Sequence, residues 1–147
     1  MAELVFHNGG PTVDMSDCEA RDYNGKSPDP EKPGKLLDGK MDTKWLELNV
    51  EVRSESILYI TCKENKKFTD FTYVTGDDEP GRDPLQWLLE GGDDAKGQHN
   101  IVYHVLHDQK EDAAPPLARM TALNAFQIHE GSGVFKATSA SRRAGRV

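Results

Sequence analysis

The chain of 147 residues has little cysteine and no long hydrophobic run. Its two cysteines, Cys18 and Cys62, are too few to form a disulfide framework. They could pair with each other, but we expect free thiols in a reducing compartment, which favours the cytoplasm. No apolar stretch approaches the ~20 residues needed to cross a bilayer, so we expect no transmembrane segment. The N-terminus also lacks the basic start and long apolar stretch of a signal peptide.

Positive charge is outweighed by negative charge. The chain has 18 Lys and Arg against 25 Asp and Glu, which gives a formal net charge of -7. Because binding to a phosphate backbone requires a basic face, this balance argues against a nucleic-acid partner. Three arginines near the C-terminus are the exception: Arg142, Arg143 and Arg146. We interpret residues 138–147 as a flexible tail, the alternative being a functional basic patch.

Long helical periodicity is absent, and short segments with strand-like patterns alternate with breaks that contain glycine and proline. The predicted strands are residues 12–16, 45–52, 56–63, 70–75, 85–90, 100–107, 124–129 and 134–137. Residues 56–63 are apolar on both faces, which predicts a central strand. In residues 100–107 we expect Ile101, Tyr103 and Val105 to point inward. This pattern predicts one all-β domain over residues 1–147, an antiparallel β-sandwich.

The N-terminal part of the chain is poor in periodicity and rich in breakers. Residues 1–34 contain Gly9-Gly10-Pro11, Pro28, Pro30 and Pro33. Only residues 12–16 within this part read as a short strand. We therefore predict that residues 1–34 form a long loop region laid over the body of the domain.

A charged loop, TGDDEPGRDP at residues 75–84, separates two of the predicted strands. Its two prolines exclude both a helix and a continuous strand. Its candidate ligand-binding residues are Asp77, Asp78, Glu79 and Arg82. Carboxylates here can hold a cation or accept hydrogen bonds from sugar hydroxyls. Arg82 and Asp83 also have a structural interpretation, in which the arginine makes a bidentate pair with a carboxylate and fixes the loop.

Catalytic signatures are missing from the sequence. It contains no Ser-His-Asp spacing, phosphate-binding loop or nucleophile elbow. A glycosidase would need two carboxyl groups about 5–10 Å apart across a cleft, and only residues 77–83 offer carboxylates close together in the sequence. Trp45 and Trp87 could stack on sugars, but both lie beside leucines, which favours a place in the core. We therefore expect a protein that is not an enzyme.

Two stretches of the chain resemble a known family. Residues 36–45 read LLDGKMDTKW, and residues 73–94 read YVTGDDEPGRDPLQWLLEGGDD. In this order and at this spacing they resemble the discoidin-like, galactose-binding-like family, which includes the coagulation factor type C domains. The resemblance covers roughly residues 35–107 and implies an eight-stranded jelly roll.

The resemblance also implies a function. Family members are non-catalytic as a rule, and loops at one end of the sandwich bind sugars in some members and lipid headgroups or proteins in others. Many hold a structural calcium ion near the DG…T turn, and the matching residues here are Asp38 and Thr43. A glutamate on the family's final strand can complete that site. This chain departs from the pattern at Lys40 and at its C-terminal end, GSGVFKATSASRRAGRV.

We therefore expect a binding module that recognises a carbohydrate or similar ligand through these loops. The alternative is an intracellular protein–protein interaction module within a larger assembly, without sugar binding. Free thiols and the missing signal peptide favour that alternative.

Overall fold

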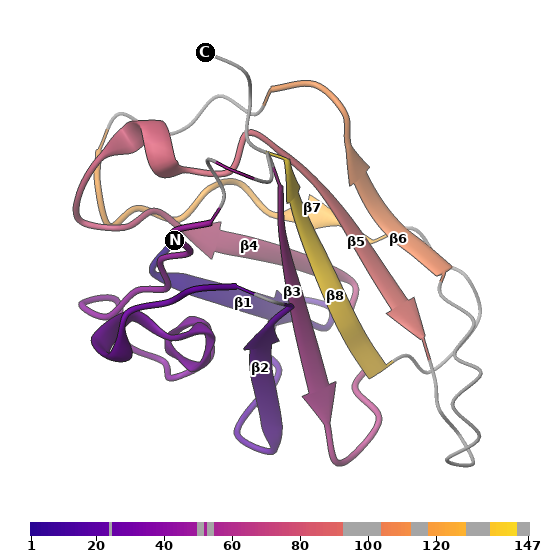
Figure 1. Cartoon of the computed structure of the whole chain (residues 1–147). Helices are drawn as coiled ribbons and strands as arrows, with labels where there is room; N and C mark the ends of the chain where they lie inside the picture. The colour runs from indigo at the N-terminus through magenta and orange to yellow at the C-terminus, as the bar shows by residue number, and fades with distance from the viewer. Residues whose placement is uncertain are drawn as a thin grey trace.

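The structure, a computed structural model, describes residues 1–23, 25–49, 52, 55–92, 104–112, 118–128 and 136–143 (Figure 1). The strands in this part of the chain are β1 (Glu3–His7), β2 (Cys18–Asp22), β3 (Glu55–Cys62), β4 (Asp70–Val74), β5 (Gln86–Gly92), β6 (His104–Gln109), β7 (Phe126–Gln127) and β8 (Lys136–Arg143). Three short 3-10 helices accompany them: η1 (Asp29–Glu31), η2 (Pro33–Leu36) and η3 (Pro80–Arg82).

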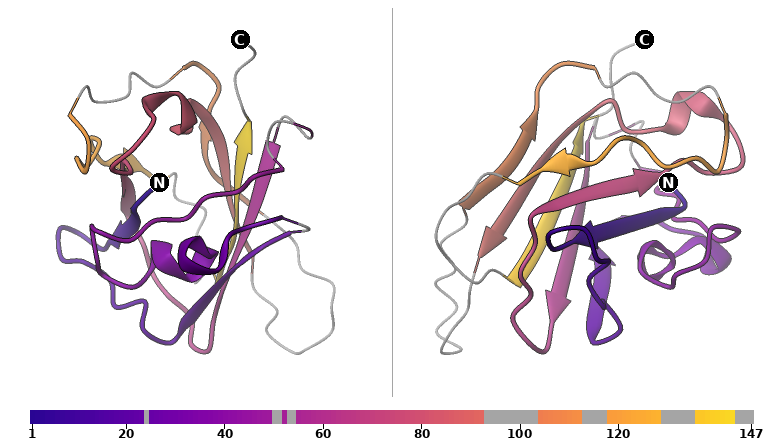
Figure 2. Two further views of the ribbon diagram at one scale, coloured as in Figure 1. Left: turned by 60° about the vertical axis from the view of Figure 1, so that its left-hand side comes forward. Right: turned by 180° about the vertical axis from the view of Figure 1, so that it is seen from behind.

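The strands form two antiparallel sheets. The smaller sheet has the order β1-β4-β7, and the larger has the order β2-β3-β8-β5-β6. The strands of the smaller sheet run across those of the larger one, and the two sheets form separate layers (Figures 1 and 2). The prediction of an all-β chain with antiparallel sheets is confirmed. β3 lies inside its sheet, between β2 and β8, as expected, but only one of its two faces is buried.

The core lies between the two sheets because alternate residues of each strand face inward. The larger sheet contributes Leu58 and Ile60 from β3 and Trp87 and Leu89 from β5 to one cluster of buried side chains. The smaller sheet contributes Leu4, Phe6, Phe71 and Tyr73 to the same cluster. Trp45 and Trp87 are both buried, so the predicted core role of the two tryptophans is confirmed.

The prediction for residues 1–34 is wrong, because this region contains two strands and two 3-10 helices. β1 buries Leu4 and Phe6, and its register with β4 runs from Glu3 opposite Val74 to His7 opposite Asp70. The glycines and prolines lie after β1 and after β2, so they delimit these strands without interrupting them. In the segment 12–16, Thr12 makes a single bridge to His7.

Residues 45–49 are not a strand, contrary to the prediction for 45–52. Their backbone amides donate to three separate segments: Trp45 to Met1, Leu46 to Glu31 and Leu48 to Lys26, at 2.9, 3.1 and 3.0 Å. A strand ladder requires successive bonds to one partner strand, and this segment instead ties three loops together.

The C-terminal strands also differ from the prediction. β8 occupies residues 136–143, so most of the predicted flexible tail is a paired strand between β3 and β5. Residues 134, 135 and 144–147 lie outside the described residues. β6 begins at His104, and its Val105 is 53% exposed, so the expected inward position of Val105 is wrong. Ile101 and Tyr103 lie outside the described residues.

The two cysteines form a disulfide, and the expectation of free thiols is wrong. Cys18 opens β2 and Cys62 closes β3, and the two are opposite each other in the register of this strand pair. The argument for a reducing compartment therefore loses its basis. In the part of the chain that the structure describes, no helix has the length and apolar character needed to cross a membrane.

Candidate functional site

Polar segments gather at one end of the five-stranded sheet. β3 and β5 begin there, at Glu55 and Gln86, and both residues are opposite Arg143 of β8. The segments 25–49 and 75–85 precede these two strands in the chain, and Lys44 joins the two segments through its ion pairs with Asp77 and Asp78. We call these two segments, together with the first residues of β3 and β5, the loop end of the molecule. It contains both sets of residues that the sequence analysis singled out.

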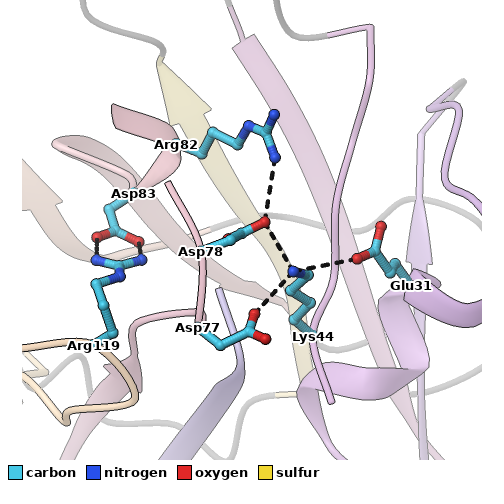
Figure 3. Close-up of polar contacts among 7 residues, drawn as sticks. All are labelled: Glu31, Lys44, Asp77, Asp78, Arg82, Asp83 and Arg119. Atoms are coloured by element: carbon cyan, nitrogen blue, oxygen red, sulfur yellow. Dashed lines mark hydrogen bonds and ion pairs between the residues drawn. The ribbon is translucent and has the colours of Figure 1, made fainter. Parts of the chain in front are cut away.

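Lys44 is the centre of an ion-pair cluster at the loop end (Figure 3). Its Nζ lies 2.8 Å from Asp77 Oδ1, 2.8 Å from Asp78 Oδ2 and 3.4 Å from Glu31 Oε1. Arg82 Nη1 approaches the same Asp78 oxygen at 3.2 Å. One ammonium group therefore joins the loop 75–84 to η1 and to the turn before Trp45.

Lys44 keeps the Asp77 and Asp78 carboxylates ionised. The hydrogen bond from Lys44 is the main reason that the pKa of Asp77 is lowered. For Asp78, burial raises the pKa, but the Lys44 hydrogen bond and the charges of Lys44 and Arg82 outweigh it, so the pKa is lowered. Hydrogen bonds to Asp77 and then Asp78 raise the pKa of Lys44 in turn. Charge of both signs is thus stable over the physiological range.

Asp83 fixes the other side of the loop. Its carboxylate is buried and makes a bidentate pair with Arg119, at 2.5 and 3.1 Å (Figure 3). Beside it, the Tyr73 hydroxyl donates to the Pro84 carbonyl at 2.9 Å. A bidentate pair was predicted for this loop, but with Arg82; the structure assigns it to Arg119, which the sequence analysis did not consider.

The four predicted ligand-binding residues therefore have different surroundings. Asp77 and Asp78 are engaged by Lys44, and Arg82 makes one contact with Asp78. Glu79 precedes η3, is exposed and makes no side-chain cap to that helix. Glu79, Arg82 and the outer part of Asp77 are the polar groups that this loop presents to solvent.

Asp38 and Thr43 lie together in the turn before Lys44. The Thr43 hydroxyl is 2.9 Å from both carboxylate oxygens of Asp38 and 3.2 Å from the Lys40 carbonyl. The Lys40 amide donates to Asp38 Oδ1 at 3.0 Å, and Lys35 Nζ lies 3.5 Å from Oδ2. The two residues predicted for calcium are thus brought together, with Lys35 as a neighbouring cation.

A third oxygen-bearing side chain, Glu3, lies beside this turn, and its position there was not predicted from the sequence. The Gly39 amide donates to Glu3 Oε1 at 3.3 Å, while Oε2 is buried with no hydrogen-bond partner among the described residues. Burial, helped by the charge of Asp38, raises the pKa of Glu3 to about 7, against the opposing effect of the Gly39 and Lys40 amides.

The chemical type of the oxygen ligands around the turn suits a calcium ion. Two carboxylates, a hydroxyl and a backbone carbonyl are all hard oxygen donors, and Ca²⁺ takes six to eight oxygens, with water among them. The buried Glu3 oxygen without a partner is the observation that favours this fit. Across the described ranges, no group of three or more His, Cys, Asp or Glu is arranged to hold a metal ion.

Two hollows open beside the first residues of β3 and β5. One, of about 380 Å³, is lined in part by Asp22, Tyr23 and Glu55. The other, of about 530 Å³, is lined in part by Glu55, Leu88 and Asp108. Tyr23 is 53% exposed and packs edge-on against Tyr59, with ring centroids 5.8 Å apart. Nothing in the strand pattern pointed to Tyr23, because it lies in the region read as a loop.

Replacing Lys44 with methionine is expected to lower the free energy of unfolding by about 1–2 kcal/mol. The estimate is above that for an exposed ion pair because one ammonium serves three carboxylates and is only 19% exposed. Without it, Asp77 and Asp78 also repel each other. Urea denaturation at low salt measures the loss, and 0.5 M NaCl should reduce it.

Lys32→Met is the matched control for this experiment. Among the described residues the ion pair of Lys32 is with Asp29, and both side chains are mostly exposed, so we expect no measurable change in stability. Equal effects of the two substitutions would show that the Lys44 cluster has no special stabilising role.

No protein-family model matches this chain, and no curated protein matches it.

Proposed function

We propose that this chain is a non-catalytic binding module of the galactose-binding-like jelly-roll type, which recognises a carbohydrate through its loop end. Two facing antiparallel sheets with eight described strands support the jelly roll. The observation that carries the binding function is the double anchoring of the loop 75–84, by Lys44 on one side and Arg119 on the other. A preorganised loop loses little conformational freedom when a ligand binds.

The electrostatics of the loop support a binding role over a catalytic one. A glycosidase requires one carboxyl group that stays protonated to act as the general acid. The pKa values of Asp77 and Asp78 are lowered, chiefly through Lys44, so neither is suited to donate a proton near neutral pH. Asp83 is buried and engaged in a bidentate pair with Arg119.

The exposed groups of the loop end suit a sugar. Glu79 and Arg82 offer an acceptor and several donors for hydroxyl groups, and the tyrosine ring of Tyr23 offers an apolar face with a polar tip. The hollow beside Tyr23, with Asp22 and Glu55 on its wall, provides a concave surface next to that ring. The second hollow adds Leu88 and Asp108 at the same end.

We also propose a structural calcium ion at the turn of residues 38–43, held by Asp38 and Thr43. Such an ion would supply charge neutralisation and a fixed shape for the turn, and it would not take part in a reaction. Lys35 is a nearby cation, so the affinity should be modest and salt-dependent.

A glycan array followed by NMR titration of any hit tests carbohydrate binding. We expect Kd values in the micromolar to millimolar range, with shifts confined to the loop end. Glu79→Ala, Arg82→Ala or Tyr23→Ala should weaken binding about tenfold, or about 1.4 kcal/mol, for each important contact. Glu64→Ala is the matched control, since it removes an exposed glutamate just after β3, at the opposite end of that strand.

The results for the individual variants show which part of the loop end binds the sugar. Loss with Tyr23→Ala alone would move the binding site from the loop 75–84 to the hollow beside β3. An array without hits, together with unchanged NMR spectra in sugar titrations, would overturn the carbohydrate proposal.

A protein ligand is the second candidate function, supported by a different observation. Four large hydrophobic residues of the chain before β3 are exposed: Tyr23, Met41, Leu48 and Val52. If they form one contiguous patch, a protein partner would be suited to cover it. Affinity capture with the wild-type chain and with the double variant Leu48→Ser/Val52→Ser tests this function. Partners retained equally by both proteins would contradict it.

A further inference from the structure

Glu3 occupies an unusual position for a charged residue. It is the first residue of β1, opposite Val74, the last residue of β4, and only 7% of it is exposed. Carboxylates this deeply buried are almost always paired with a cation or bound by several donors. Glu3 receives the Gly39 amide at one oxygen, and its Oε2 has no hydrogen-bond partner in the described part of the chain.

The charge of Asp38, in the neighbouring turn, makes ionisation of the buried Glu3 carboxyl group less favourable. The nearby Lys35 ammonium group is paired with Asp38, 3.5 Å from its Oδ2. Asp38 is also better satisfied, since it receives the Lys40 amide and the Thr43 hydroxyl. The turn therefore holds two carboxylates, and the more deeply buried of the two has the fewer donors.

We propose that Glu3 supplies the second carboxylate to a divalent cation at this turn, so that the ion joins β1 to residues 38–43. The inference rests on the calcium proposed above for Asp38 and Thr43. A divalent ion would satisfy the buried Glu3 oxygen and neutralise both carboxylates at once. Among the described residues, Glu3, Asp38, the Thr43 hydroxyl and the Lys40 carbonyl are the oxygen donors at this turn, and water can complete the number that calcium requires.

The cation would thereby connect the N-terminal strand to the loop end. β1 is paired to β4, and β4 leads directly into the loop 75–84. The Trp45 amide already bonds to the Met1 carbonyl at 2.9 Å, so the start of β1 and the end of the 38–43 turn are neighbours without the ion. Binding of the ion should therefore stabilise this corner without rearranging the fold.

The test compares the wild-type chain with Glu3→Gln, Asp38→Asn and Asp77→Asn. Calcium binding is measured by isothermal titration, and Tm is measured in calcium and in chelator. We expect calcium to raise the Tm of the wild type and of Asp77→Asn. Asp38→Asn and Glu3→Gln should each weaken calcium binding at least ~10-fold, because each removes a charged ligand.

Glu3→Gln should also change the order of stabilities. In chelator it should melt at or above the wild type, because a neutral amide of similar shape no longer buries a charge. In calcium it should melt below the wild type. If Glu3 serves only as acceptor of the Gly39 amide, a bond that glutamine can also accept, the Tm difference between Glu3→Gln and the wild type would be the same in calcium and in chelator, and this would overturn the inference.

The remaining outcomes separate this inference from the calcium proposal. Unchanged calcium affinity in Glu3→Gln, with loss in Asp38→Asn, would overturn the role of Glu3 and leave the ion in place. A wild type without calcium binding would overturn both. Loss of binding in Asp77→Asn would place the ion at the Lys44 cluster and also overturn it. If Glu3→Gln does not fold, Glu3→Asp replaces it: weaker binding supports the inference, and unchanged affinity overturns it.

Discussion

Replacing Arg119 with alanine is expected to lower the free energy of unfolding by about 3–5 kcal/mol, which corresponds to a drop in Tm of roughly 10 °C. Arg119 is the bidentate partner of Asp83, whose side chain is 1% exposed. Without the guanidinium group, the Asp83 carboxylate would remain buried with its charge uncompensated. The penalty comes from this desolvated charge far more than from the lost contact itself.

Urea denaturation of the wild type and two variants measures this effect. Arg82→Ala is the matched control, because Arg82 belongs to the same loop but is 53% exposed and makes one contact of 3.2 Å with Asp78. We expect it to cost less than about 1 kcal/mol. The double variant Arg119→Ala/Asp83→Asn should recover part of the loss by removing the buried charge. A cost below about 1 kcal/mol for Arg119→Ala would show that Asp83 is compensated in another way.

The same variant also tests the proposed function. If double anchoring preorganises the loop 75–84, then releasing the Arg119 side should increase hydrogen exchange in this loop before the sheets open. It should also weaken the binding of any carbohydrate, although Arg119 is not among the proposed contact residues. Unchanged hydrogen exchange in the loop would show that Arg119 stabilises the fold without ordering the loop. It would also weaken the case for a ligand site at the loop.

The strands that the sequence predicts best are those that bury an alternating face. Residues 56–63, 70–75 and 85–90 were predicted, and the structure has β3, β4 and β5 at Glu55–Cys62, Asp70–Val74 and Gln86–Gly92. β2 was missed because it is an edge strand with little apolar content: of CEARD, only Ala20 is fully buried, and Glu19 and Arg21 are exposed. Periodicity detects a strand only when enough of its residues face the core.

For a related reason, the sequence predicted only part of the candidate site. The sequence pointed to the loop 75–84 and to the turn at Asp38 and Thr43, since each is a local pattern of charge and turn residues. The partners of these elements come from distant positions. Lys44 lies 33 residues from Asp77, Arg119 lies 36 from Asp83, and Glu3 lies 36 from Gly39. Such pairs form because the sheets bring distant segments together, and they cannot be predicted from local sequence spacing.

The second large effect is expected from the disulfide. Reduction should lower the free energy of unfolding by about 4 kcal/mol, because the bond between Cys18 and Cys62 closes a loop spanning 44 residues. In the chain-entropy account, the bond restricts the unfolded chain, and the restriction grows slowly with loop length. Thermal melts with and without a phosphine reductant should differ by roughly 10 °C.

A thiol assay of the unfolded, unreduced protein shows whether the bond is present, and we expect no free thiol. Cys18→Ser/Cys62→Ser is the matched control: its Tm should equal that of the reduced wild type and should not respond to reductant. Because β2 is an edge strand, its loss of order should appear first, as faster hydrogen exchange at residues 18–22. Two free thiols in the unreduced protein would instead restore the prediction made from the sequence. β2 would then be held by its backbone pairing with β3 and by the packing of Ala20 and Cys18 against the core.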